Sequence, residues 1–300
     1  MLKSLLLSLV LMLPVPALAC GGAEACEVEG GIYHIALPDE PVRGAVVFLH
    51  GFGGRGERVV ANKGLMAQFT ERGYALIAPT ALPRVPGSPN SWNSRMTASR
   101  RDDIAFIRAA LADATARFDL PAGAMVSGFS GGGMMVWRLA CSAPSSFAAY
   151  APIAGLMWRP LPATCDGPVQ LFHVHGWSDP VVPIEGRSVA GGRITQGDLF
   201  VGLNLLREAS ACIKDDPDSY DAQGMYLIRR WTSCAPGGDL SFALHPGGHA
   251  IPKGWAGLAL NWYEALPAPA SPAPASSAPA SPAPAKAEAC LQENAATDTC

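Results

Sequence analysis

A serine flanked by glycines is the clearest chemical signal in the chain. The segment Gly128-Phe-Ser-Gly-Gly132 matches the pattern Gly-x-Ser-x-Gly and lies between an expected strand and an expected helix. A serine at such a turn has a strained backbone that projects its hydroxyl, and the helix N-terminus favours negative charge beside it. We therefore predict that Ser130 is the nucleophile of an acyl transfer. A glycine-rich turn without chemistry is the alternative.

A serine hydroxyl needs a base, and the base needs a group that orients it. Of the six histidines, His249 lies in the loop His245-Pro-Gly-Gly-His249, between the last expected strand and the last expected helix. Such a loop can carry an exposed side chain to the edge of a sheet, so we predict His249 as the base, with His245 as its competitor. Asp179 comes five residues after an expected buried strand, beside prolines that fix the turn. We predict it as the orienting carboxylate.

Backbone N–H groups must stabilise the oxyanion that forms when a serine attacks a carbonyl. The segment Leu49-His-Gly-Phe-Gly-Gly54 follows the first expected buried strand, and its glycines allow a close approach of the backbone. We predict one N–H from Phe52 or Gly53 and the second from Gly131, the residue after the serine. His50 is interpreted as a brace for this loop rather than as the base.

The other histidines and the tryptophans are open to more than one interpretation. His173 and His175, separated by one residue, are expected to be structural and to face opposite sides of their strand. They indicate no metal site, and the chemistry above requires neither a metal nor an organic cofactor. Trp92, Trp158 and Trp177 are candidates for the walls of an acyl pocket. Trp92 and Trp177 are the predicted substrate contacts, with burial in the core as the alternative.

Strand-like and helix-like stretches alternate along the body of the chain. Short apolar runs between turn residues predict strands, and apolar stripes with a period near 3.6 residues predict helices. The expected strands are residues 32–37 (an edge strand), 44–49, 74–78, 124–127, 147–153, 169–174 and 240–244. The expected helices are residues 62–72, 99–118, 132–141, 196–210 and 253–263. This alternation predicts an α/β fold with a mostly parallel central sheet and helices on both faces.

Length and composition exclude several classes of protein. The chain has 300 residues, of which 49% are hydrophobic and 16% charged, enough apolar material for a sizeable core. Its formal net charge of −3 excludes a basic nucleic-acid-binding surface spread over the chain. We divide the chain into a signal peptide (residues 1–19), a catalytic domain (residues 20–266) and a disordered tail rich in Pro, Ala and Ser (residues 267–300).

The N-terminus and the cysteines both indicate export. Residues 1–19 hold an early lysine, an apolar run too short to span a membrane and a small-x-small cleavage site, which is typical of a secretory signal peptide. The expected cut leaves Cys20 first, with lipidation of Cys20 as the alternative. Eight cysteines suggest local disulfides formed in an oxidising compartment. The expected pairs are Cys20–Cys26, Cys141–Cys165, Cys212–Cys234 and Cys290–Cys300.

Together these motifs resemble the α/β-hydrolase superfamily, in particular secreted esterases of the polyhydroxybutyrate depolymerase and feruloyl-esterase-like branch. The resemblance covers the chain from Cys20 to about Leu266. Its matching pieces are Leu49-His-Gly-Phe-Gly-Gly54, Trp92, Asp102-Asp-Ile-Ala-Phe-Ile107, Gly128-Phe-Ser-Gly-Gly132, Phe147-Ala-Ala-Tyr-Ala-Pro-Ile-Ala-Gly155, His175-Gly-Trp-Ser-Asp-Pro-Val-Val-Pro183 and the His249 loop. The resemblance implies Ser130 as nucleophile, Asp179 as acid and His249 as base, in the chain order of that fold.

The expected function is that of a secreted serine esterase, extracellular or periplasmic, that cleaves short hydroxyalkanoate esters. A feruloyl or acetylxylan-type esterase is the alternative within enzymes, and a non-catalytic envelope binding protein on the same fold is the alternative of another class. We expect no nucleic-acid partner and no membrane span, and the oligomeric state stays open. The loops at residues 81–98 and 155–168 are expected to set the acyl and alcohol specificity.

Overall fold

The computed structural model describes residues 20–39 and 41–267. The expected signal peptide, the pair Cys290–Cys300 and all but the first residue of the expected tail lie outside these residues. Within them, no helix is both long enough and apolar enough to cross a membrane.

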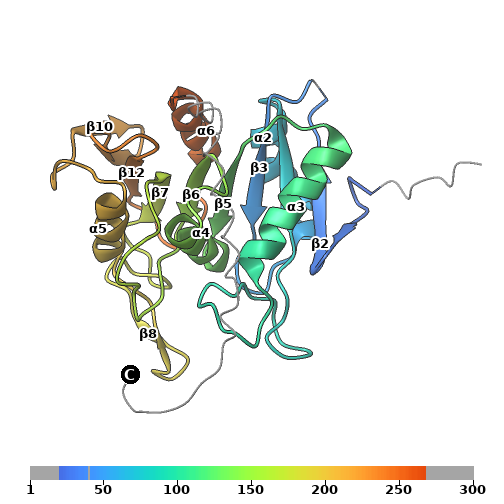
Figure 1. The fold of residues 1–300 in the computed structure, drawn as a ribbon, viewed down its shortest axis with the longest axis horizontal. Coiled ribbons are helices and arrows are strands. Elements are labelled where there is room, and N and C mark those ends of the chain that lie inside the picture. The colour runs from blue at the N-terminus through green and yellow to red at the C-terminus, as the bar shows by residue number, and fades with distance from the viewer. Residues whose placement is uncertain (1–19, 40, 268–300) are drawn as a thin grey trace, which may run out of the picture. The chain divides into compact units, whose positions relative to one another are not determined.

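The described residues form a ten-stranded sheet in the order β1-β2-β4-β3-β5-β6-β7-β12-β11-β10, and β8 and β9 form a separate hairpin (Figure 1). The central strands β4, β3, β5, β6, β7 and β12, in their order across the sheet, pair in parallel. The pairs on both flanks of the sheet are antiparallel. The strand bounds are Cys26–Val28 (β1), Gly31–Ala36 (β2), Gly44–Leu49 (β3), Tyr74–Pro79 (β4), Ala124–Phe129 (β5), Ala149–Ile153 (β6), Gln170–Gly176 (β7), Ser188–Val189 (β8), Ile194–Thr195 (β9), Ser219–Gln223 (β10), Tyr226–Trp231 (β11) and Asp239–His245 (β12).

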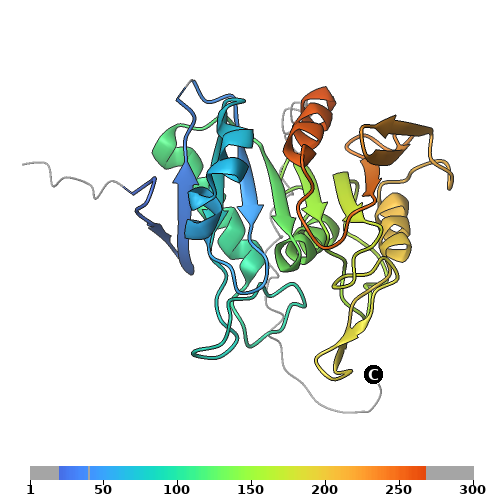
Figure 2. The same cartoon turned by 180° about the vertical axis from the view of Figure 1, so that it is seen from behind.

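Helices cover both faces of the sheet. Their bounds are Gly56–Ala61 (α1), Lys63–Thr70 (α2), Asp103–Phe118 (α3), Gly131–Ser142 (α4), Leu199–Ala209 (α5) and Trp255–Ala265 (α6). Helices α3, α4 and α5 lie in front of the sheet in Figure 1, whereas α6 and the α1–α2 pair lie in front in Figure 2. Val47 of β3 belongs to the first of two apolar cores and Phe48 to the second. This arrangement confirms the predicted α/β fold.

Side-chain caps decide where helices α2, α3 and α5 begin. The carboxylate of Asp102 accepts hydrogen bonds from the N–H groups of Ile104 and Ala105, at 2.9 and 3.1 Å, so α3 begins at Asp103 rather than at the expected residue 99. The side chain of Asn62 caps α2 in the same way, by accepting from Leu65 N–H at 3.1 Å.

The structure corrects the expected flanks of the sheet. The strand expected at the edge, β2, lies between β1 and β4, because the three-residue strand β1 pairs outside it. Strands β1, β8 and β9 are too short for a periodic pattern, and all five residues of β10 are exposed. These strands were not expected because an apolar run is the signal that sequence analysis uses.

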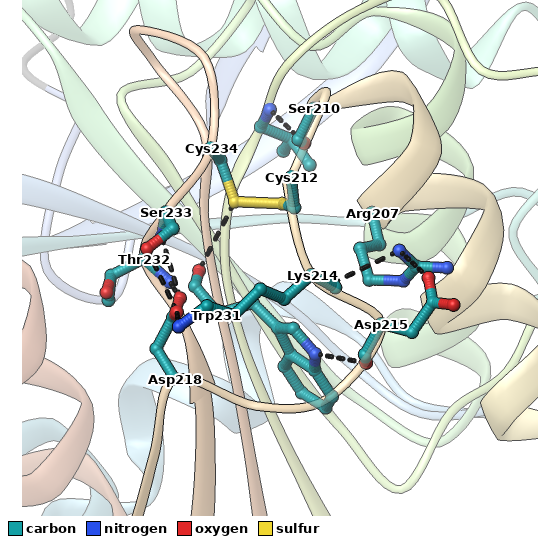
Figure 3. Close-up of a disulfide and its surroundings, with 11 residues drawn as sticks. Arg207, Ser210, Cys212, Lys214, Asp215, Asp218, Trp231, Thr232, Ser233 and Cys234 are labelled. Atoms are coloured by element: carbon teal, nitrogen blue, oxygen red, sulfur yellow. Dashed lines mark hydrogen bonds and ion pairs between the residues drawn. A yellow bond between two sulfur atoms is a disulfide. The ribbon is translucent and has the colours of Figure 1, made fainter.

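Three of the expected disulfides are present. Cys20–Cys26 fixes the start of the described chain, and Cys141–Cys165 joins the end of α4 to the loop before β7. The Sγ atom of Cys20 is therefore committed to a disulfide and cannot also carry the thioether of a lipid. Cys212–Cys234 joins the segment after α5 to the segment after β11 (Figure 3).

Candidate active site

The three residues predicted for acyl transfer all follow strands at one edge of the sheet. Ser130 comes directly after β5, Asp179 three residues after the end of β7, and His249 four residues after the end of β12. Strands β5, β6, β7 and β12 are parallel neighbours. Their carboxyl ends therefore share one edge, which is where open α/β sheets place their ligand sites.

The turn that carries Ser130 is strained and packed too closely for larger residues. Ser130 has φ 55° and ψ −117°, a combination that non-glycine residues adopt only when the surroundings impose it. A Cβ atom on Gly132 would lie 2.0 Å from the carbonyl oxygen of Leu49, and one on Gly128 would lie 2.7 Å from the carbonyl carbon of Gly132. The strand and the helix meet closely here only because both positions are glycine.

A hydrogen-bonded chain joins the three side chains. His249 Nε2 lies 2.9 Å from Ser130 Oγ, and His249 Nδ1 lies 2.7 Å from Asp179 Oδ2. A carboxylate can only accept, so Nδ1 carries the proton and Nε2 presents a lone pair to the serine hydroxyl. The ring of Phe129 packs against the imidazole at 4.8 Å between ring centroids. The arrangement can take a proton from Ser130 and hold the resulting imidazolium.

Asp179 is held on both of its oxygens. Its Oδ1 accepts hydrogen bonds from the N–H groups of Val181 and Val182, both at 2.8 Å, while Oδ2 accepts from His249. Burial alone would raise the pKa of this carboxyl, but the hydrogen bonds from His249, Val182 and Val181 outweigh burial and lower the pKa below its ordinary value. Asp179 is therefore ionised at neutral pH.

A second hydrogen-bonded network of side chains lies behind Asp179. The indole N–H of Trp137 donates to His173 Nδ1 at 3.3 Å, His173 Nε2 contacts His175 Nδ1 at 3.0 Å, and His175 Nε2 contacts Val182 O at 2.7 Å. The expectation that the two histidines face opposite sides is wrong, because residues two apart on a strand share a face. Since Trp137 can only donate, both neutral rings carry their proton on Nε2.

The two imidazoles of this network stay neutral, and the network fixes the turn after β7. Burial lowers the pKa of His173 well below its ordinary value and also lowers the pKa of His175. The network ends on the carbonyl of Val182, the same residue whose N–H donates to Asp179. The position of the candidate orienting carboxylate is therefore set by buried hydrogen bonds that extend to helix α4.

The structure separates the two candidates for the first oxyanion donor. Gly53 N–H donates to Asn90 O at 2.8 Å and is occupied, whereas Phe52 N–H has no acceptor among the described residues. A Cβ on Gly131 would lie 3.3 Å from Phe52 N, so the backbones of these two residues are neighbours. Gly131 is the first residue of α4, and its N–H has no acceptor within the helix. Phe52 and Gly131 therefore present the two available N–H groups.

His50 braces this loop, as its position in the sequence suggested. Its Nδ1 donates to Gly51 O at 2.7 Å, and its Nε2 accepts from Ala81 N–H at 3.0 Å, which ties the loop to residues 81–98. The indole N–H of Trp92 donates to the carbonyl of His50 at 2.8 Å. The imidazole of His50 is used on both nitrogens and is not available as a base.

Comparison with known proteins identifies the family. No protein-family profile matches the chain. A curated protein named "Putative esterase NocK", from Nocardia uniformis subsp. tsuyamanensis, is 35% identical over 243 residues, which cover 73% of this chain and 68% of the relative. The chain belongs to the α/β-hydrolase esterases. Feruloyl esterase C of Emericella nidulans is 28% identical over 238 residues, 74% of this esterase and 77% of the fungal protein.

Two solved structures share the fold of this esterase. Acetyl xylan esterase from Aspergillus awamori matches with a TM-score of 0.60 at 16% identity, over 78% of this chain and 94% of the other. The Bacillus cereus carboxylesterase matches with a TM-score of 0.52 at 13% identity, over 79% and 94%. The relatives and the shared fold place the chain among the carboxylic ester hydrolases.

A cavity of about 1020 Å³ opens beside Ser130 in this esterase. Trp92 and Trp158 form part of its wall, as does the β8–β9 hairpin, which sequence analysis missed. The signal that could have found the hairpin is the Gly191-Gly192 pair between Val189 and Ile194. Among the described residues, no group of three or more His, Cys, Asp or Glu side chains could hold a metal.

Trp177 lies away from this cavity. Its side chain is 68% exposed, and it lines a separate depression together with Phe200 and Tyr220. The structure therefore brings Trp92 to the cavity beside Ser130 but not Trp177. The cause is the turn after β7, which directs Asp179 to the site and leaves Trp177 on the outer side. The backbone N–H of Trp177 donates to His245 O at 2.7 Å.

Proposed function

We propose that Ser130, His249 and Asp179 form the catalytic triad of this ester hydrolase. The observation that carries the proposal is the unbroken chain of hydrogen bonds from Ser130 Oγ through His249 to Asp179, at 2.9 and 2.7 Å. A non-catalytic binding protein on the same fold has no need for this alignment, and the short Ser130–His249 distance argues against that alternative.

In the proposed reaction, Ser130 Oγ attacks the ester carbonyl carbon while His249 Nε2 takes the hydroxyl proton. The carbonyl oxygen becomes an oxyanion, which the N–H groups of Phe52 and Gly131 stabilise. His249 then gives its proton to the leaving alcohol, and an acyl-serine remains. Water attacks this acyl group in the second half of the reaction, His249 accepts and returns a proton, and the carboxylic acid leaves. Asp179 stabilises the imidazolium in both halves.

We further propose short hydroxyalkanoate esters as the substrates. The cavity is large enough for an acyl group and an alcohol group together, and its wall mixes the aromatic rings of Trp92 and Trp158 with polar side chains. Esters of phenolic acids are the second candidate, which the relationship to feruloyl esterase C favours.

We also propose that the protein is exported. The three disulfides support this proposal, since such bonds persist in oxidising compartments. The signal peptide at residues 1–19 stays a prediction. N-terminal sequencing of protein recovered from a secreting host tests it, with Cys20 as the expected first residue and an intact residue 1 as the contrary result.

Ester hydrolysis by the purified protein and its Ser130→Ala variant tests the triad. The substrates are p-nitrophenyl butyrate, the methyl ester of a 3-hydroxybutyrate dimer, and methyl ferulate. We expect Ser130→Ala to lower kcat at least about 10³-fold on every ester that the wild type cleaves. Ser145→Ala is the matched control, because Ser145 is exposed and makes no side-chain hydrogen bond within the described residues. A Ser130→Ala variant with more than a tenth of wild-type kcat would contradict the proposal.

A further inference from the structure

Three arginines stand on the wall of the cavity that contains Ser130. Arg84 belongs to the loop at residues 81–98, Arg187 directly precedes β8, and Arg193 directly precedes β9. This loop and the β8–β9 hairpin extend beyond the sheet at the same end of the molecule (Figures 1 and 2). No Asp or Glu among the described residues lines the cavity. The chain as a whole has a net charge of −3, so the positive wall does not reflect a generally basic protein.

Each of these arginines is anchored in the same way. Arg84 Nε donates to Ser91 Oγ at 3.3 Å, Arg187 Nε donates to Val181 O at 2.9 Å, and Arg193 Nε donates to Ala190 O at 3.0 Å. Within residues 20–39 and 41–267, their terminal amino groups make neither a hydrogen bond nor an ion pair. The side chains are held at one end, and their terminal donors are left for a ligand.

Several arginines elsewhere in this esterase pair with carboxylates. Arg72 pairs with Glu264 at 2.6 Å, Arg117 with Asp113 at 2.9 Å, and Arg207 with Asp215 at 2.7 Å. Those pairs lie on other parts of the surface, away from the cavity. Arginines such as Arg108 also lack an ion pair among the described residues. What distinguishes the three cavity arginines is that they line one cavity, beside Ser130, whose described wall contains no carboxylate.

We propose that this esterase selects esters that bear a carboxylate, which Arg84, Arg187 and Arg193 bind while Ser130 attacks the ester carbonyl. The proposal rests on the proposed function of Ser130 and specifies its substrate class. The terminal amino groups of a guanidinium form a planar fork that matches the two oxygens of a carboxylate. The remaining wall is largely apolar, with Trp92, Trp158 and Ile194 among its residues. The substrate is thus an apolar ester with one anionic end.

The carboxylate can belong to either part of the ester, and two matched pairs of substrates distinguish the sources. For the acyl part, the pair is p-nitrophenyl hemiglutarate and p-nitrophenyl methyl glutarate. For the alcohol part, the pair is the 3-hydroxybutyrate dimer as free acid and its methyl ester. Within each pair only the charge and one methyl group differ. The readout is the ratio of kcat/KM for the anionic ester to kcat/KM for the neutral one.

We expect the ratio to exceed about ten in at least one pair at low ionic strength, and to fall as salt is added, because the arginines are exposed and screened. Each of Arg84→Gln, Arg187→Gln and Arg193→Gln should lower that ratio about two- to five-fold. The triple variant should bring it close to one. Arg108→Gln removes the same charge from an exposed position on α3 and should leave the ratio unchanged.

The outcomes separate this inference from the proposed function. A wild-type protein that cleaves the neutral esters with a ratio near or below one in both pairs overturns the inference and leaves ester hydrolysis by Ser130 in place. The same ratio in wild type and triple variant also overturns it. If folded protein cleaves none of the four esters, both the inference and the proposed function fail. The wild-type ratio and its salt dependence decide the matter even if a variant does not fold.

Discussion

The edge of the sheet around Ser130 and the flank that contains β10 and β11 are held by different interactions. Around Ser130, buried hydrogen bonds position Asp179 and His249, and glycines allow the backbones to meet. On the flank, the Cys212–Cys234 disulfide joins two segments, and polar contacts surround it (Figure 3). These contacts are exposed or partly buried. Among them, Lys214 contacts the Asp218 carboxylate at 3.2 Å, and this carboxylate also accepts from Thr232 and Ser233 N–H at 2.8 Å.

The difference follows from what each region has to do. Proton transfer requires heavy atoms to stay within hydrogen-bond distance and each proton to sit on a defined nitrogen, which packed and hydrogen-bonded side chains can impose. The flank only has to keep the path of the chain, which a covalent cross-link does by restricting the unfolded state. Changes at the edge should therefore reduce activity, with a loss of stability only where they disturb close packing, and changes on the flank should reduce stability while activity stays nearly unchanged.

Asp179→Asn gives the largest expected effect. The amide cannot hold the Nδ1–H tautomer of His249 as the carboxylate does, so we expect kcat to fall on the order of 10³–10⁴-fold. The free energy of unfolding should change far less, because the amide oxygen can still accept from Val181 and Val182. Asp215→Asn applies the same substitution on the flank, where the side chain is 92% exposed, and should change kcat less than about two-fold. Equal losses in the two variants would remove the distinction between the regions.

Gly132→Ala tests the close packing beneath the nucleophile. The added methyl group would lie 2.0 Å from a backbone oxygen that cannot move aside cheaply. We expect a loss of unfolding free energy of about 3 kcal/mol or more, together with reduced kcat.

Gly257→Ala is the matched control for that variant. Gly257 lies within α6, and a Cβ there meets no atom within 4 Å. This change should stabilise the protein by about 0.5–1 kcal/mol, because alanine favours the helix. Urea unfolding of both variants provides the comparison, and a Gly132→Ala variant as stable as wild type would refute the packing argument.

The positions of Ser130, Asp179 and His249 could be predicted because each follows a buried strand. Continuous apolar runs such as residues 44–49 mark parallel strands clearly, and β3 has the predicted bounds. Once the strands are known, the residues after their carboxyl ends are known to share one edge. The fold and the candidate triad therefore depend on local signals that one sequence contains.

Features that depend on contacts between distant loops could not be predicted. The choice between Phe52 and Gly53 is decided by Asn90, whose carbonyl occupies the N–H of Gly53. The outward position of Trp177 accompanies a backbone hydrogen bond from Trp177 N–H to the carbonyl of His245, the last residue of the neighbouring strand β12. The part of the cavity wall that Val189 and Ile194 form depends on the β8–β9 hairpin, whose strands have only two residues each. None of these contacts has a periodic pattern in the sequence.

Replacing Cys212 and Cys234 with serine should lower the stability and leave kcat nearly unchanged, whereas Asp179→Asn should mainly lower kcat. The bridge closes a loop with a sequence separation of 22 residues, and its loss should lower the unfolding free energy by about 3 kcal/mol. We expect kcat at 25 °C to stay within about two-fold of wild type, because no residue of this region lines the cavity beside Ser130. Calorimetry and ester kinetics on the double variant measure both quantities. A large fall in kcat without a fall in stability would contradict the view that this disulfide only keeps the path of the polypeptide on this flank.

The pH dependence of stability should show two steps: an upper step from buried histidines outside the flank, and a lower step from carboxylates of both regions, since the pKa values of Asp179 and Asp218 are both lowered. Histidines 34, 50, 173, 175 and 245 all have pKa values lowered by burial, and none lies in residues 207–234. Below about pH 6.5 the unfolded chain takes up protons that the folded protein does not, so stability falls as pH falls, by up to about 1.4 kcal/mol per pH unit for each histidine.

On the flank, hydrogen bonds from Ser233 and Thr232 lower the pKa of Asp218 below its ordinary value, so its contribution is present above about pH 4 and is lost only at lower pH. Unfolding free energies measured between pH 8 and pH 3 should therefore fall in two steps. His173→Phe should reduce the slope of the upper step by about one proton, and Asp218→Asn should alter only the lower one. A flat profile from pH 7 to pH 5 would show that the buried histidines do not stay neutral, and the argument for fixed tautomers behind Asp179 would fail with it.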